Sequence, residues 1–225
     1  MLPHRRLGFN VLAIATVAVL ASASAQALPD DAVPIVTTLW ETLQCPVRLA
    51  PDDSDAASLR TFEERQRYRD LLGAYLARLP GQADHALLMP VVGVRVAQVA
   101  DTYLAPRDGG RSHEGQDIFA ARGTPVVSAT AGLVYEMSSR FRGGRSVMVL
   151  GPGGRRYFYS HLDAYAETLR EGQWVEPGTL LGYVGNDGNA MSTPPHLHFG
   201  AFDFDPTRCR FRAFDPLPLS VDRLP

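Results

Sequence analysis

After about Gln98, the sequence turns into short runs of alternating or β-branched residues separated by glycine, and this pattern constrains the fold most. The runs lie at residues 126–137, 146–150, 155–161, 172–184 and 196–202. Turn signals separate them at Gly143-Gly144, at residues 151–154 (GPGG) and at Asp187-Gly188. Short strands at such spacing predict an antiparallel, β-rich domain, which we place at residues 99–225.

Residues 28–98 differ in composition from the β-rich part, because they are rich in alanine, leucine, arginine and acidic residues. Apolar residues recur at helical spacing from Leu59 to Leu79, and Pro80-Gly81 ends the run. We therefore predict an α+β chain in which a small helical segment at residues 28–98 precedes the β-rich domain.

The amino terminus has the layout of a secretory signal peptide. Arg5 and Arg6 precede an apolar run, and small residues end at Ala25-Gln26-Ala27. No cysteine follows the run to accept a lipid, so cleavage of residues 1–27 predicts export, with the periplasm as the destination and no membrane span afterwards. An uncleaved membrane anchor is the alternative.

The charge of the chain argues against nucleic acid as a partner. The formal net charge is −2, with 22 basic and 24 acidic residues, and every basic residue is arginine. The absence of lysine also argues against a lipoyl or biotinyl carrier domain, whose hairpins residues 171–185 resemble, because those domains need a lysine for attachment.

Two cysteines, Cys45 and Cys209, are far apart in the sequence. In an oxidising compartment outside the cytoplasm, such a pair predicts a disulfide between the amino-terminal segment and the end of the chain. Two buried free thiols are the alternative. A metal role is disfavoured, because neither cysteine has a second cysteine or a histidine at ligand spacing.

Four of the six histidines lie in three short segments of the β-rich part, at His113, His161, His196 and His198. Side chains alternate along a strand, so His196 and His198 are expected on one face while Leu197 faces the core. A group of imidazoles with one nearby carboxylate suits zinc, since catalytic zinc takes three nitrogen or oxygen ligands and leaves one position to water.

Asp117 is the natural carboxylate for such a site, four residues after His113. His113-Glu114 looks like the start of a helical zinc motif whose glutamate is a general base. However, position 117 is aspartate and Gly115 disfavours a helix, so we expect Glu114 to be an exposed bystander.

Three segments in order, 113–117 (HEGQD), 159–162 (YSHL) and 195–199 (PHLHF), resemble the lysostaphin and LytM type of zinc peptidase, which cleaves peptidoglycan cross-bridges. The resemblance covers about residues 101 to 205. It implies a lysostaphin-type peptidase domain with hairpins like those of a duplicated hybrid motif. Pro194 and Gly200 depart from residues that the family often has there, which affects the expected fit of substrate more than activity.

The resemblance also implies roles for individual residues. His113, Asp117 and His198 would bind one Zn²⁺ per chain, while His161 and His196 would be catalytic and not ligands. Such imidazoles suit proton transfer and stabilisation of an oxyanion. Alternation along the strand places Tyr159 on the face of His161, where it would contact substrate; a core or rim position is the alternative.

The predicted function is therefore that of a secreted zinc metalloendopeptidase acting on amides in peptidoglycan stem or cross-bridge peptides. A catalytically silent activator or binding module for a cell-wall amidase is the alternative. For residues 28–98 we consider a packing role, a docking surface for a wall-hydrolase partner, and an inhibitory prodomain with His85 as a fourth ligand.

Overall fold

The computed structural model of the chain describes residues 81–223, with gaps at 108, 140–141, 206–207 and 209. The strands are β1 (Leu87–Leu88), β2 (Pro106–Arg107), β3 (Arg111–Ser112), β4 (Gln116–Phe119), β5 (Pro125–Val127), β6 (Gly132–Ser138), β7 (Ser146–Leu150), β8 (Arg156–Ser160), β9 (Leu162–Tyr165), β10 (Trp174–Val175), β11 (Leu180–Val184), β12 (His196–Asp205), β13 (Arg210–Phe214) and β14 (Ser220–Val221). Short 3-10 helices connect some of them: η1 (Val96–Gln98), η2 (Pro152–Gly154), η3 (Gly188–Ala190) and η4 (Leu217–Leu219).

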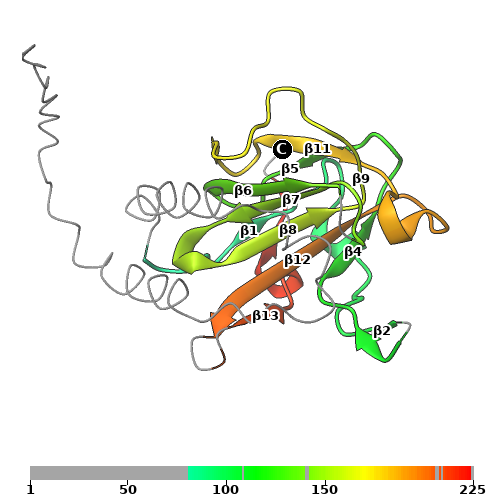
Figure 1. Cartoon of the computed structure of the whole chain (residues 1–225), viewed down its shortest axis with the longest axis horizontal. Coiled ribbons are helices and arrows are strands. Elements are labelled where there is room, and N and C mark those ends of the chain that lie inside the picture. The colour runs from blue at the N-terminus through cyan, green and yellow to red at the C-terminus, as the bar shows by residue number, and fades with distance from the viewer. Residues whose placement is uncertain (1–80, 108, 140–141, 206–207, 209, 224–225) are drawn as a thin grey trace, which may run out of the picture.

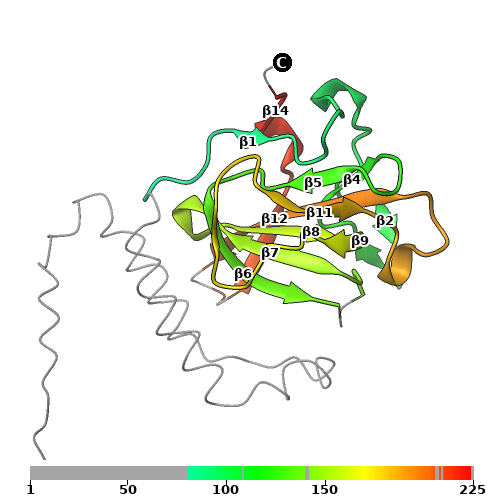
Figure 2. The same ribbon diagram turned by 90° about the horizontal axis from the view of Figure 1, so that it is seen from above.

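The main sheet is antiparallel and has the strand order β10-β6-β7-β8-β12-β13, with β4 also pairing with β12 (Figure 1). A second antiparallel sheet has the order β5-β11-β9 (Figure 2). The prediction of a mainly antiparallel β domain is therefore confirmed. The predicted run at 126–137 is split into β5 and β6, because Ser128 Oγ donates to the Thr130 carbonyl and closes a turn between them.

The hydrophobic core draws buried side chains from both sheets into one cluster. In β12 these are Leu197, Phe199 and Ala201, every second residue of the strand. Strand alternation then turns His196 and His198 to the opposite face, as the sequence predicts. Other members come from neighbouring strands: Val147, Val149, Tyr157 and Tyr159 from β7 and β8, and Val126, Leu162, Leu181 and Val184 from the second sheet.

Residues 81–98 are the described end of the segment for which the sequence predicts helix, and they contain β1 and η1 with no α-helix. Leu87, Met89 and Val91 are buried at alternate positions, and β1 pairs in parallel with β14 near the carboxyl end (Figure 2). Residues 87–88 thus pair with a distant strand rather than forming a helical turn. The division at residue 98 stays a prediction, because residues 28–80, like the predicted signal peptide, lie outside the described residues.

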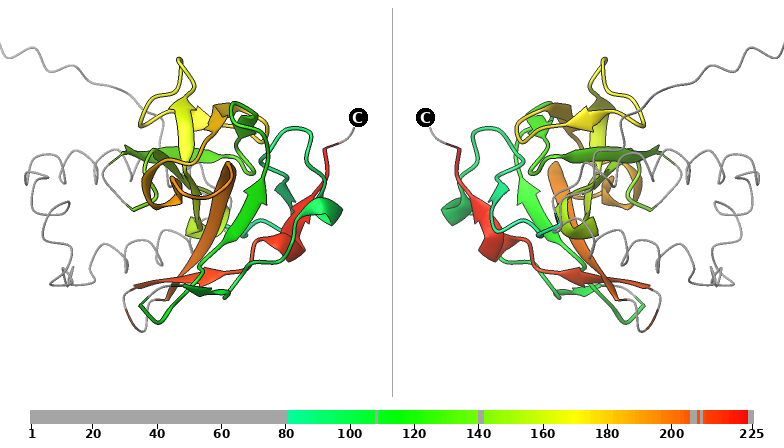
Figure 3. Two further views of the ribbon diagram at one scale, coloured as in Figure 1. Left: turned by 90° about the vertical axis from the view of Figure 1, so that its right-hand side faces the viewer. Right: turned by 90° about the vertical axis from the view of Figure 1, so that its left-hand side faces the viewer.

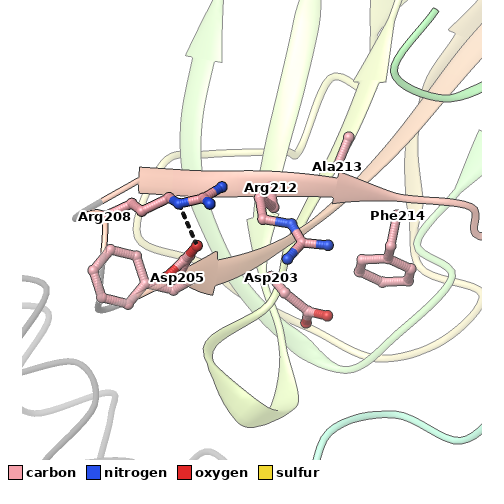
Figure 4. A pocket seen from close by; sticks show the side chains of 7 residues that line it. Asp203, Asp205, Arg208, Arg212, Ala213 and Phe214 are labelled. Atoms are coloured by element: carbon pink, nitrogen blue, oxygen red, sulfur yellow. Dashed lines mark ion pairs between the residues drawn. The ribbon is translucent and has the colours of Figure 1, made fainter. Parts of the chain in front are cut away.

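β12 is the longest strand of the described chain and separates two polar features. Its first residues carry the histidine pair and pair with β4, and the ribbons of the two strands lie side by side in Figure 3. Its far end borders a hollow of about 520 Å³ (Figure 4). The hollow is lined by Asp203, Phe204, Asp205, Arg208, Arg212, Ala213 and Phe214. From His198 to Phe204 a strand advances by about 20 Å, so this hollow is separate from the histidines. Within residues 81–223, no helix is long and apolar enough to cross a bilayer.

Candidate metal centre

Segments far apart in the chain meet where β12 begins. In the register of the main sheet, His198 lies opposite Asp117 of β4 on one side and opposite Ser160 of β8 on the other. Paired residues of an antiparallel sheet point to the same face, so Asp117 and His198 share one face. His113 precedes β4, and His161 follows β8.

Three side chains converge there closely enough to share one ion. His113 Nε2 lies 3.0 Å from Asp117 Oδ1 and 2.7 Å from His198 Nδ1, and the last two atoms are 3.2 Å apart. Zinc bonds of about 2.0–2.1 Å in tetrahedral geometry would hold ligand atoms about 3.3 Å apart. Two imidazole nitrogens and one carboxylate oxygen at these distances therefore fit a zinc ion.

The Asp117 carboxylate is buried, with 8 % of its side chain exposed, and both of its oxygens have partners. Oδ1 faces the imidazoles, and Oδ2 accepts from Arg107 Nη2 at 2.5 Å. Burial opposes ionisation, but the hydrogen bonds to His113 and His198, the charge on His113 and the Arg107 hydrogen bond outweigh it, so the pKa of Asp117 lies well below its usual range. Asp117 thus presents one ionised oxygen to the centre.

Three of the imidazoles are oriented by main-chain carbonyls. The Nδ1 atoms of His113, His161 and His196 lie 2.7, 2.9 and 2.8 Å from the carbonyl oxygens of Thr102, Asp187 and Pro194. A carbonyl only accepts, so each Nδ1 carries its proton and donates. In the neutral ring, the unprotonated nitrogen is then Nε2, which for His113 is the atom that faces Asp117 and His198.

His161 and His196 lie beside the three converging groups. Their ring centroids are 4.9 Å apart, and His161 is 5.9 Å from the ring of His198. Burial, with the nearby His198 and His196, lowers the pKa of His161 to about 4. His161 is therefore neutral near pH 7, and its Nε2 is able to accept a proton.

Residues 111–206 match the model of peptidase family M23. This part of the chain is an M23 peptidase domain. The chain is 37 % identical over 115 residues to the L-Ala–D-Glu endopeptidase of Bacillus subtilis, covering 49 % of this chain and 35 % of that protein. It is 36 % identical over 92 residues to lysostaphin of Staphylococcus simulans, covering 40 % of this chain and 18 % of that protein. The chain thus spans about a third or less of the length of these curated relatives.

A crystal structure of a candidate glycyl-glycine endopeptidase LytM from Ruminococcus gnavus is also similar. It has 25 % sequence identity and a TM-score of 0.52, and the match covers 89 % of this chain and 86 % of that one. The likeness agrees with the mainly antiparallel fold of the M23 domain.

Tyr159 occupies the core position that the sequence leaves as the alternative to a contact with substrate. Its side chain is fully buried in the core, where its hydroxyl accepts from the Ala129 amide at 2.9 Å, so it does not line the site. The prediction assumed that the strand continues to His161. Instead, β8 ends at Ser160, and His161 has a φ of +63°, in the left-handed region. Alternation therefore cannot relate the two side chains.

Three further predictions concern Glu114, His85 and the cysteine pair. Glu114 is exposed, as expected of a bystander, and His85 is also exposed and outside the group of converging ligand atoms. Cys45 and Cys209, the predicted disulfide pair, lie outside the described residues.

Sequence reasoning missed residues that contact the site: Thr102 and Arg107 contact the converging groups, and Phe119 contacts His196. Phe119 lies opposite His196 in the sheet register, is 51 % exposed, and has its ring 5.1 Å from that of His196. Alternation from Asp117 would have placed Phe119 on the face of the site. No local signal marks Thr102 or Arg107, because their contacts depend on the turn that precedes β4.

Gly115 permits the close approach of β12 to the turn before β4. A Cβ there would lie 2.6 Å from the Phe199 carbonyl oxygen and 2.8 Å from Cε1 of His198. We expect Gly115→Ala to displace the His198 ring, to lower zinc content, and to reduce the free energy of unfolding by about 1–3 kcal/mol. Metal analysis and thermal denaturation measure the two effects.

Gly172→Ala is the control for Gly115→Ala. The added methyl there meets open space, but the backbone φ is +81°, so it strains the chain without touching the histidines. Equal zinc content in Gly115→Ala and wild type would contradict the steric explanation.

Proposed function

We propose that the M23 domain is a zinc metalloendopeptidase that hydrolyses amide bonds in peptidoglycan stem or cross-bridge peptides. The observation that carries the proposal is the convergence of His113, Asp117 and His198 within 4.8 Å, with two further imidazoles beside them. The names of the similar endopeptidases support the reaction class and the wall peptide as substrate.

His113 Nε2, Asp117 Oδ1 and His198 Nδ1 would hold the ion. When bound, zinc supplies Lewis-acid polarisation of the scissile carbonyl and lowers the pKa of a water molecule from about 16 towards 7. No glutamate base is needed beside such a site, which agrees with the exposed position of Glu114.

Proton transfer is assigned to the two remaining imidazoles. His161 is neutral and presents Nε2, so it accepts the proton of the attacking water. His196 Nε2 lies 3.7 Å from Asp117 Oδ1, and the His196 ring lies 4.9 Å from that of His161. The proton that His161 takes from the water would pass to the leaving amine, directly or through His196, whose protonated ring would also stabilise the oxyanion.

A charged side chain, Arg107, and an aromatic side chain, Phe119, lie next to these groups. The Arg107 side chain is 39 % exposed while one of its N–H groups donates to Asp117, and Phe119 offers an apolar ring beside His196. A peptide crossing the centre would pass a cation on one side and an aromatic ring on the other. Peptidoglycan stem peptides contain both carboxylates and methyl side chains, so they suit this pair.

The test is mass spectrometry of muropeptides released from purified sacculi of two wall types, with metal analysis of the same preparation. We expect about one zinc per chain, loss of hydrolysis after chelation, and recovery when zinc is restored. The identity of the released fragments assigns the scissile bond. Folded protein that holds no zinc and releases no fragment would instead support the silent activator module.

We also propose export to the periplasm, with residues 28–98 as a packing element or as a docking surface for a wall-hydrolase partner. Support comes from the signal-like residues 1–27 and from the wall substrate proposed above. Sequencing the amino terminus of the protein recovered from the periplasm tests this proposal, because cleavage predicts a new terminus after Ala25 or Ala27.

A further inference from the structure

Thr102 contacts both residues that begin the proposed zinc site. Its carbonyl oxygen accepts from His113 Nδ1 at 2.7 Å, and its hydroxyl oxygen accepts from the Asp117 amide at 2.9 Å. The carbonyl fixes the tautomer and ring direction of His113. The hydroxyl holds the backbone of Asp117 at the point where its carboxylate leaves the strand. One residue thus orients two groups that lie four positions apart.

Gln116 holds Thr102 in this position from beneath the site. Its Oε1 accepts from the Thr102 amide at 2.9 Å and from the Thr102 hydroxyl at 3.2 Å. Its Nε2 donates to Asp101 Oδ1 at 2.9 Å and to Asp215 Oδ1 at 2.8 Å. Gln116 is 1 % exposed, so its amide is committed to these partners and links the turn before β2 to the end of β13.

The direction of each hydrogen bond follows from these partners. Both acidic residues accept from Gln116 Nε2, so Oε1 must face Thr102. The Thr102 hydroxyl then donates its one proton to Oε1 and keeps a lone pair for the Asp117 amide. The chain of bonds Asp101/Asp215–Gln116–Thr102–Asp117 therefore has one consistent arrangement, which resists rotation of the hydroxyl.

The geometry points to Thr102 as a positioning residue that sets the orientation of His113 and Asp117 for the metal, with Gln116 as the clamp that holds it. Neither side chain touches the metal position or a substrate. This inference rests on the proposed zinc site, and partners that orient ligands in this way contribute about 10- to 100-fold to metal affinity.

The experiment compares the zinc affinity of the full-length wild-type chain with that of the full-length Thr102→Val variant. Competition with a chromophoric chelator measures both affinities. Valine keeps the shape and the carbonyl but removes the hydroxyl, so the Asp117 amide loses its acceptor. We expect the dissociation constant for zinc to rise about 10- to 100-fold and the Asp117 amide to exchange faster with solvent. Thr102→Ser, which keeps the hydroxyl, should retain the wild-type affinity.

Thr130→Val is the matched control for general destabilisation. Thr130 is 1 % exposed and donates to Asp84 Oδ2 at 2.8 Å, so the variant loses a buried threonine hydrogen bond away from the histidines. Its zinc affinity should stay unchanged. An equal loss of affinity in both valine variants, or none in a folded Thr102→Val, would overturn the positioning role.

Two further outcomes are decisive. If Thr102→Val does not fold, Gln116→Met takes its place, because it leaves Thr102 intact but removes the clamp; an unchanged zinc affinity there overturns the inference. If the wild-type chain itself binds no zinc, the proposed function fails, and the positioning role fails with it.

Discussion

His113→Ala will lose hydrolysis of sacculi by at least about 10³-fold, and added zinc will not restore it. His113 contributes one of three converging ligand atoms, and its loss leaves one imidazole and one carboxylate to hold the ion. A metal ion supplies several kcal/mol of transition-state stabilisation, and each 1.36 kcal/mol changes the rate tenfold. Release of muropeptides before and after zinc addition measures the effect.

His85→Ala is the control for this prediction, because His85 is an exposed histidine outside the converging group. It should match the wild-type chain in zinc content and rate. Zinc-dependent activity that survives in His113→Ala would show that the reaction uses another site. The wild-type chain treated with chelator should resemble His113→Ala until zinc is returned.

The second large effect is expected for His161→Asn, which should lower kcat by about 10²- to 10⁴-fold while zinc content stays at the wild-type level. His161 presents Nε2 as a proton acceptor and contributes no atom to the three converging ligands. Asparagine is the appropriate replacement because the backbone at this position has a φ of +63°, where asparagine is tolerated and alanine is strained. Steady-state kinetics on a defined peptide, with metal analysis, test the separation.

The contrast with His113→Ala makes the assignment testable. A ligand variant should lose metal and rate together, whereas His161→Asn should lose rate alone. If His161→Asn also loses zinc, then His161 binds the ion, and the division between ligands and proton-transfer groups is wrong. His161→Gly, which fits the same backbone, checks that the asparagine amide does not itself substitute for the imidazole.

Much of the fold could be predicted because its strands are short β-branched or alternating runs separated by glycine. β7 has the residues that the pattern indicates, and the shared face of His196 and His198 follows from the buried Leu197 between them. Convergence with His113 and Asp117 came from the resemblance of three ordered motifs, since no local pattern shows which strands become neighbours. The pairing of Asp117 with His198 depends on how β4 and β12 come together in the folded chain.

What could not be predicted depends on backbone conformation where a strand ends. His161 lies one residue beyond β8, and its positive φ cancels the alternation that placed Tyr159 beside it. The Thr102 contacts were equally hidden, because the turn that forms them has no periodic pattern. Leu87 and Leu88 form a strand by pairing with β14, a contact distant in the sequence that no local pattern shows.

The orienting acceptors of His113, His161 and His196 are all peptide oxygens, at Thr102, Asp187 and Pro194. No side-chain replacement deletes a peptide oxygen, so a substitution at Asp187 or Pro194 leaves the acceptor in place, and a substitution at Thr102 tests only its hydroxyl. One-residue insertions or deletions shift the acceptors themselves. Length variation in these loops therefore disturbs a part of the catalytic geometry that substitution does not reach.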